Sequence, residues 1–152
     1  MISLIQKIKN IYQISHGAQD ALASKLKKIE FEKGQCLLED GNVCSLLYFI
    51  EKGAVRGFYN LDGKEVTHWF GFDTDFVTSF HSFITEKPSV EYVQAIEETV
   101  VWSISKLDLT QLFDDFPDIE RFVRITYERY YIRLEERYVN AQFKSAKQRY
   151  VD

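Results

Sequence analysis

Residues 48–70, YFIEKGAVRGFYNLDGKEVTHWF, decide the fold class of this chain. The segment contains short apolar runs separated by the turn signals Lys52-Gly53 and Asp62-Gly63. A tight turn of the primed type needs positive φ angles, which glycine adopts without strain. The Asp62-Gly63 pair therefore predicts a hairpin that joins strands over 54–60 and 64–70.

The same pattern of short apolar runs separated by turn signals extends from about residue 30 to residue 105. Gly34, Gly41, Gly53 and Gly63 follow one another at spacings of seven to twelve residues, as in chains of short antiparallel strands. Such strands close as a small barrel or jelly roll. Besides the hairpin, the pattern predicts strands near 35–39, 46–50, 92–96 and 99–104.

Helices are expected before this β core. Ile5, Ile8, Ile11 and Tyr12 recur at helical spacing. The run GAQDALASKLKKIEF, residues 17–31, continues the pattern with Ala21, Leu22, Leu26 and Ile29. We expect two N-terminal helices in 1–29, followed by the β core in 30–105.

Helical periodicity returns in 106–143. Ser105 is a candidate N-cap for KLDLTQLFDDF, and Pro117 suits the first turn of a helix that runs to at least Asn140. That helix has two apolar stripes. One contains Ile119, Val123, Tyr127, Tyr130, Leu134 and Tyr138, and the other contains Phe122, Ile125, Ile132, Val139 and Phe143.

Two stripes indicate burial on two sides of the helix. We expect one side to pack on the β core and the other on the same helix of a second chain. Val123, Tyr127, Tyr130, Leu134 and Tyr138 are the expected homodimer contacts. The alternative is that both stripes line one wide groove within the chain.

Composition restricts the classes of function. The 152 residues with 45% hydrophobic content suit one domain, and the net charge of −4 argues against direct binding to a nucleic-acid backbone. Cys36 and Cys44 lack the partners of a disulfide framework or zinc site. The N-terminus does not resemble a signal peptide, and no run is long enough to span a membrane. We expect a cytoplasmic protein that does not bind membranes.

FEKGQCLLEDGNVCSLLYFIEKGAVRGFYNLDGKEVTHWF (31–70) and EETVVWSISKLDLTQLFDDFPDIERF (97–122) resemble the cyclic-nucleotide-binding sensor domain of Crp/Fnr-type bacterial transcription regulators, the family of the catabolite activator. The resemblance implies a β-roll, also called a double-stranded β-helix, with flanking helices and a long C-terminal dimerisation helix. It also implies a DNA-binding domain after the sensor. Residues 144–152, KSAKQRYVD, are similar to its opening, so DNA contact would come from a domain absent from this chain.

The resemblance further implies a pocket in which a Gly-Glu turn holds the ribose and an Arg-Ser pair holds the phosphate. Aligned without gaps, the Gly-Glu positions fall on Thr78 and Ser79, and the Arg-Ser positions on Ser89 and Val90. A buried phosphate needs a compensating charge, usually a bidentate arginine. We therefore expect a degenerate pocket that does not bind cyclic AMP or cyclic GMP in the usual manner.

A small-molecule ligand of unidentified chemistry, uncharged or weakly acidic, would lie between segments 75–83 and 87–92. The expected pocket residues are Thr78, Ser79, Phe80, His81, Lys87, Ser89, Val90 and Tyr92. Such a mixture of aromatics and hydroxyls is typical of ligand sites. The alternative is that the aromatics fill the pocket.

Other chemistries receive less support. His16, His68 and His81 do not form a metal-binding pattern, and no cysteine cluster for an iron–sulfur centre is present. Ser79 and His81 lack an orienting acid for nucleophilic catalysis. We expect no cofactor, no metal and no enzyme activity, but a dimeric sensor domain of a transcription regulator. The alternatives are a ligand-free dimerisation scaffold and, less favoured, a cupin-like metal enzyme.

Overall fold

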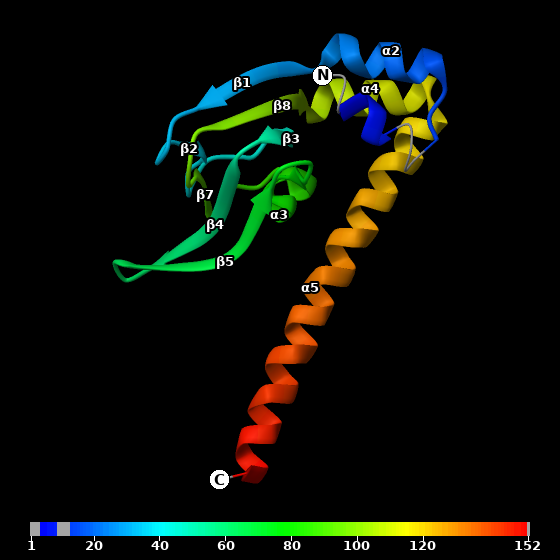
Figure 1. Cartoon of the computed structure of the whole chain (residues 1–152). Helices are drawn as coiled ribbons and strands as arrows, with labels where there is room; N and C mark the ends of the chain where they lie inside the picture. Colours follow the sequence, from blue (N-terminus) through cyan, green and yellow to red (C-terminus); the bar gives the residue numbers. More distant parts are fainter. Residues whose placement is uncertain (1–3, 9–12, 152) are drawn as a thin grey trace.

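Two four-stranded antiparallel sheets form the centre of the computed structural model, which describes residues 4–8 and 13–151, with side chains to residue 142 (Figure 1). The first sheet has the order β1 (Lys27–Phe31), β8 (Thr99–Ser105), β3 (Leu46–Lys52) and β6 (Phe76–Val77). The second has the order β2 (Cys36–Leu38), β7 (Tyr92–Ala95), β4 (Ala54–Leu61) and β5 (Lys64–Phe72). The expected mainly β fold with flanking helices is confirmed.

The β4–β5 hairpin forms where the Asp62-Gly63 pair predicts it. Asp62 and Gly63 have φ angles of 53° and 85°, as a primed turn requires, and Leu61 pairs with Lys64 across it. Asn60 Oδ1 accepts a hydrogen bond from the Gly63 N–H at 3.0 Å. The turn is therefore encoded locally, by residues adjacent in sequence.

The second N-terminal helix ends earlier than the periodicity indicates. Residues 4–8 are helical, and helix α2 (His16–Lys25) begins with the Ala18 N–H donating to Ser15 Oγ at 3.2 Å. The prediction that this helix extends to Ile29 is wrong. Residues 27–31 instead pair with β8, because Ile29 and Phe31 alternate with exposed residues and face the core. Ile11 and Tyr12 lie outside the described residues.

Two short elements between β5 and β7 have no counterpart among the predicted ones. Strand β6 has two residues, and helix α3 (Phe80–Thr85) has six. Neither is long enough to show a period in the sequence. Helix α3 buries Phe80 and Phe83 on one side, so it is held by contacts with distant residues.

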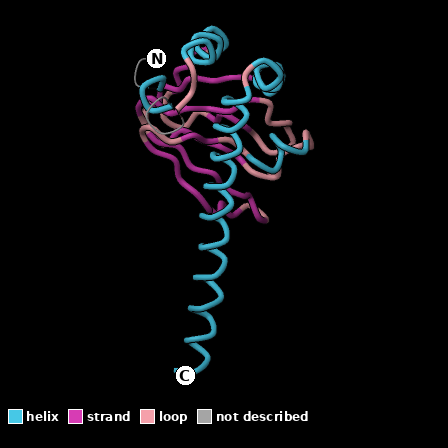
Figure 2. The backbone as a smooth tube through the Cα atoms, turned by 90° about the vertical axis from the view of Figure 1, so that its right-hand side faces the viewer, coloured by secondary structure: helices cyan, strands magenta, loops and turns pink. Residues whose placement is uncertain are grey.

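The C-terminal helices begin at the predicted residues. The Asp108 N–H donates to Ser105 Oγ at 3.1 Å at the start of α4 (Lys106–Asp115), and α5 (Pro117–Val151) begins at the proline. Its first turns are buried, whereas every described side chain from Tyr131 to Gln142 is exposed. Figures 1 and 2 show this second half leaving the roll. Residues 144–151 continue the same helix.

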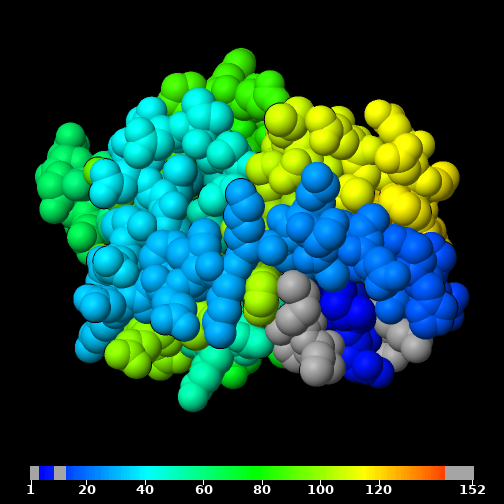
Figure 3. All heavy atoms as spheres, turned by 90° about the horizontal axis from the view of Figure 1, so that it is seen from above, coloured from blue at the N-terminus to red at the C-terminus, as the bar shows by residue number. Residues whose placement is uncertain are grey.

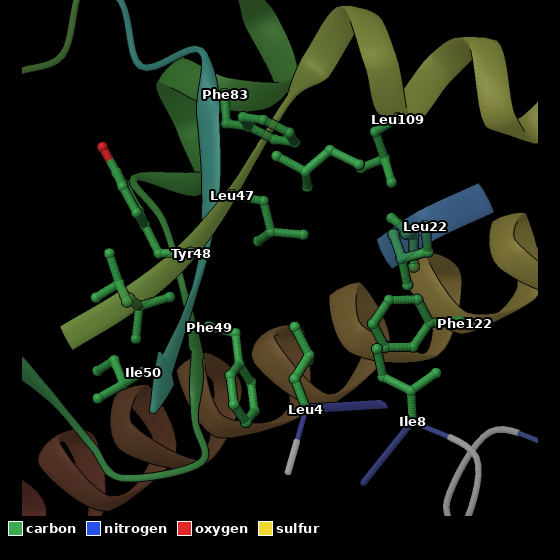
Figure 4. Close-up of a cluster of buried hydrophobic side chains, with 14 of the residues drawn as sticks. Leu4, Ile8, Leu22, Leu47, Tyr48, Phe49, Ile50, Phe83, Leu109 and Phe122 are labelled. Atoms are coloured by element: carbon green, nitrogen blue, oxygen red, sulfur yellow. The ribbon is translucent and has the colours of Figure 1, made fainter. Parts of the chain in front are cut away.

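The core joins the N-terminal helices, the first sheet and α5. In Figure 4, Leu4 and Ile8 lie beside Phe49 of β3 and Phe122 of α5. Figure 3, the view from above, shows α2 next to α4 over this region. The Phe76 ring connects the two sides, with its centroid 5.2 Å from Phe49 and 5.1 Å from Phe122. Helix α5 is thus anchored by aromatic contacts to the roll.

Replacing Phe122 should test this anchor. Phe122 has 2% exposure, so Phe122→Ala leaves a cavity and should lower the free energy of unfolding by about 3–5 kcal/mol. Leu107→Ala is the control, because Leu107 is 69% exposed and its loss should change stability by less than about 0.5 kcal/mol. Urea unfolding measures both. Equal effects of the two substitutions would contradict the anchoring role.

Candidate ligand-binding site

The two segments expected to enclose a ligand contact each other directly. Ser79 Oγ, at the start of α3, lies 3.4 Å from Ser89 Oγ. Ser89 Oγ also accepts from the Glu91 N–H at 3.0 Å and donates to the Glu91 carbonyl at 2.8 Å. The positions aligned with the family's glutamate and arginine are therefore occupied by two buried serines that bond to each other and to the backbone.

The other hydroxyls of the segment also serve the fold. Thr78 Oγ1 donates to the Leu46 carbonyl at 2.8 Å and lies 3.1 Å from Cys44 Sγ. Ser82 Oγ accepts from the Cys44 N–H at 2.8 Å and donates to the Lys87 carbonyl at 2.6 Å. These groups already have partners, so a ligand would have to compete with the fold for them.

The predicted aromatic residues pack on rings of other elements, β4 and α5. Phe80 stacks on Tyr130 of α5 with centroids 4.0 Å apart and meets Tyr127 edge-on at 5.7 Å. Tyr92 stacks on Phe58 of β4 at 4.9 Å. Burial raises the pKa of the Tyr127 and Tyr130 hydroxyls above the usual value of tyrosine. Phe80 thus joins the segment to the long helix.

Three of the predicted pocket residues are on the surface. His81, Lys87 and Val90 are exposed, and Val90 has 66% of its surface accessible. In α3, Phe80, Ser82 and Phe83 are buried and His81 is exposed, whereas Lys87 and Val90 lie in the connection between α3 and β7. The structure brings Thr78, Ser79, Phe80 and Ser89 together in the interior and leaves these three outside.

A buried carboxylate near Trp69 was not among the predicted site residues. Glu91 is 7% exposed, and its two oxygens accept from Trp69 Nε1–H at 3.3 and 3.4 Å. His68 Nε2 lies 2.6 Å from Glu91 Oε2, outside the angular range of an in-line hydrogen bond. The His68 ring stacks on Tyr59 with centroids 4.2 Å apart. The interior therefore holds an acidic group beside the position where the family has a cationic one.

Gly57 allows Trp69 to reach this carboxylate. The two residues pair across β4 and β5, and a Cβ on Gly57 would lie 2.0 Å from Trp69 Nε1. The strand register shifts between Gly57 and Phe58, which breaks the alternation of faces. The indole thus crosses β4 toward β7, and it can do so because Gly57 has no side chain.

Two small cavities lie between the roll and α5, and Phe80 and Tyr130 line both. The first has a volume of about 40 Å³ and is lined by Trp69, Thr78, Phe80, Tyr130, Arg133 and Arg137, among others. The second, of about 70 Å³, is lined by Lys7, Asp75, Phe80, Arg129, Tyr130 and Arg133, among others. Ligand sites usually measure about 300–1,000 Å³. A ligand larger than a few atoms must therefore extend into solvent or move side chains.

Metal-binding clusters and membrane-spanning helices are both absent from the described part of the chain. None of its residues form a group of three or more His, Cys, Asp or Glu side chains able to hold a metal ion. None of its helices combines the length and the apolar character needed to cross a bilayer. Cys36 and Cys44 are both unpaired.

Known proteins share this architecture. The sequence profile of the family described as "Cyclic nucleotide-binding domain" matches residues 28–116. A search of curated protein sequences gives no significant match.

Three solved structures illustrate the similarity. A cyclic nucleotide-binding domain from Methylobacillus flagellatus has 21% identity and a TM-score of 0.74, with 88% of this chain and 80% of that one covered. The Thermus thermophilus catabolite activator protein has 20% identity and a TM-score of 0.70, with coverages of 86% and 60%. The regulatory subunit of a cAMP-independent protein kinase A from Trypanosoma brucei has 23% identity and a TM-score of 0.66, with 88% of this chain and 50% of that one covered. The chain thus spans 60% or less of the length of the last two.

Substituting Gly57 should displace Trp69. In a Trp102→Phe background, Gly57→Ala should shift the Trp69 emission to longer wavelength and lower the free energy of unfolding by about 1–3 kcal/mol, because the buried Glu91 carboxylate loses a donor. Gly17→Ala is the matched control, since a Cβ there meets its nearest atom, on Phe116, at an ordinary 3.5 Å. An unchanged emission spectrum in Gly57→Ala would contradict the assigned position of the indole.

Proposed function

The chain belongs to the cyclic nucleotide-binding domain family, and from this premise we propose that it is the dimeric sensor domain of a Crp/Fnr-type transcription regulator with a degenerate nucleotide pocket. Its role is regulatory rather than catalytic, and it acts in the cytoplasm, where the unpaired Cys36 and Cys44 stay reduced. The observation that carries the proposal is the exposed apolar face of α5.

The roll covers other residues of α5 and leaves this face exposed. Val123 is 2% exposed within the single chain, and Tyr127 and Tyr130 pack on Phe80. Of the expected dimer residues, Leu134 and Tyr138 remain exposed, at 48% and 66%. The further exposed apolar residues are Tyr131, Ile132 and Val139.

We assign the dimer seam to this second half of α5. Ile132 and Val139 are seven residues apart, the spacing that keeps side chains on one line along a paired helix. A row of large apolar residues on a projecting helix is costly in water, and a second copy of the helix would cover it. Both stripes of the sequence are thus covered by the roll in the first half of α5, at Val123 and Phe122, and exposed in the second half.

The role in transcription rests on similarity to the catabolite activator protein from Thermus thermophilus. The present chain has a net charge of −4, which is unsuited to holding a phosphate backbone. DNA contact is therefore assigned to a separate domain that follows α5. The long helix would connect that domain to the sensor.

The degenerate pocket is supported by the chemistry of its interior. Ser79 and Ser89 replace the expected charged pair, and Glu91 adds a carboxylate that would repel a phosphate. Trp69 reaches across Gly57 into the same interior. The similar kinase subunit from Trypanosoma brucei is described as cAMP-independent, so this fold also occurs in a protein without that dependence.

A ligand-free dimerisation scaffold is the second candidate. The observation that favours it is that the hydroxyls of Thr78, Ser82 and Ser89 all have partners within the fold. A ligand that binds only the folded state raises the melting temperature. A sensor domain should respond in this way to its ligand, whereas a scaffold should respond to none.

Sedimentation velocity at tens of micromolar should find a dimer. Replacing both Ile132 and Val139 by Asp should convert it to a monomer, because unpaired charges would enter an apolar seam. Leu61→Asp with Val66→Asp is the matched control, since these residues are also exposed, at 59% and 37%, but lie on the hairpin. A monomeric wild-type chain would overturn the dimer assignment.

Calorimetry should find no micromolar binding of cyclic AMP. Each missing charged contact is worth roughly 1.5–3 kcal/mol, so the loss of two should weaken binding by about two to four decades. A control titration into a cyclic-AMP-binding protein under the same conditions establishes the expected signal. A micromolar dissociation constant would refute the degenerate pocket and return Lys87 to consideration as the phosphate contact.

A further inference from the structure

Positive charge is concentrated where α5 faces the roll. Arg129, Arg133 and Arg137 are spaced four residues apart, so they lie on one side of the helix, and all three line the cavities beside the Phe80–Tyr130 stack. Lys7 joins them from the N-terminal helix. We call this region the arginine groove.

The groove contains little opposing charge. Asp75 is the single acidic residue among the described residues that line the two cavities, and its Oδ2 already accepts from the Phe72 N–H at 2.9 Å. The Glu91 carboxylate lies behind the Trp69 indole, whose N–H donates to it. Arg137 donates to the His68 carbonyl at 2.9 Å, which leaves its other donors available. Arg133 lines both cavities and makes no hydrogen bond or ion pair to another described residue.

The cations are close enough to affect one another. Burial lowers the pKa of the Lys7 ammonium, Asp75 partly offsets this, and the charges of Arg129 and Arg133 lower the pKa further. An anion in the groove would relieve this repulsion. The charge pattern therefore favours a negatively charged partner over a neutral one.

Aromatic rings form the other wall. Trp69, Phe76, Phe80 and Tyr130 line the groove, and Phe70 at its edge is 53% exposed and stacks on Phe72 with centroids 6.2 Å apart. Flat apolar walls suit a planar ring, which gains from stacked or edge-on contacts. Together, the cationic and aromatic walls suit a ligand that has both a negative charge and a planar ring.

We propose that the arginine groove binds a small aromatic carboxylate, with the carboxylate on Arg133 and the ring against Trp69 and Phe80. This assignment rests on the proposed sensor function and names the ligand class for the interface between the roll and α5. A guanidinium holds a planar carboxylate through two parallel hydrogen bonds. The cation comes from α5, not from segment 87–92, because Arg133 lines both cavities and Lys87 lines neither.

The small size of the cavities limits the ligand. Cavities of about 40 and 70 Å³ cannot enclose a purine with its ribose and phosphate. A one- or two-ring acid can place its edge in the groove and leave the rest in solvent. Because such a ligand touches both β5 and α5, its binding would be linked to the position of the dimer helix.

The test uses 2-naphthoate and its neutral analogue 2-naphthalenemethanol. Calorimetry on the full chain should give a dissociation constant of about 0.1–1 mM for the acid and binding about tenfold weaker for the alcohol. In a Trp102→Phe background, the acid should also change the fluorescence of Trp69. Higher ionic strength should weaken binding of the acid but not of the alcohol.

Arg133→Gln should weaken binding of 2-naphthoate about tenfold, because one charged contact is lost. Arg121→Gln is the matched control: Arg121 is exposed on the same helix, about 18 Å away along its axis. Equal binding of acid and alcohol, an unchanged constant in Arg133→Gln, or no saturable binding of the acid would overturn the proposal. A dimer that fails to bind 2-naphthoate overturns this site alone, whereas a monomer that binds it overturns the dimeric sensor and leaves the site standing.

Discussion

The ring contacts of Phe76 with Phe49 and Phe122 fix where α5 leaves the roll, and the remaining features of the molecule depend on that direction. Because Phe122 is held in the core, the next turns of the helix are carried past α3, where Tyr130 meets Phe80. Arg133 and Arg137 then line the cavity beside Trp69 of β5, and the exposed apolar residues of this half of the helix lie between and after them. One anchor therefore sets three surfaces: the buried stripe, the groove and the proposed seam.

The features that could be predicted from the sequence are those encoded by adjacent residues. The Asp62-Gly63 turn, the Ser105 cap and the proline start of α5 each depend on a few neighbouring side chains. The pairing of residues 27–31 with β8 could not be predicted in this way, since it joins segments some seventy residues apart. Here tertiary contacts outweighed a plausible helical period.

The candidate site follows the same rule. The gapless alignment placed Ser79 and Ser89 at related positions, and their hydroxyls do meet. The Trp69–Glu91 contact was missed because it crosses an intervening strand and depends on a register shift next to Gly57, where His68 is the extra residue of β5. A buried acid next to a tryptophan gives no local signal. The inward glycine on a central strand was the one hint, since such glycines mark close approach by another group.

Helix α5 also has the geometry of a lever. It runs without interruption for 35 residues, and the last contact with the roll among its described residues is the Arg137 hydrogen bond to His68, so the part beyond extends about 21 Å at 1.5 Å per residue. A tilt of about 5° at this last contact would move the far end by roughly 1.8 Å over that length. A displacement too small to disturb the packing of the roll would thus be magnified at the end of the helix. Mechanical gain is inherent in a rigid rod held at only one end.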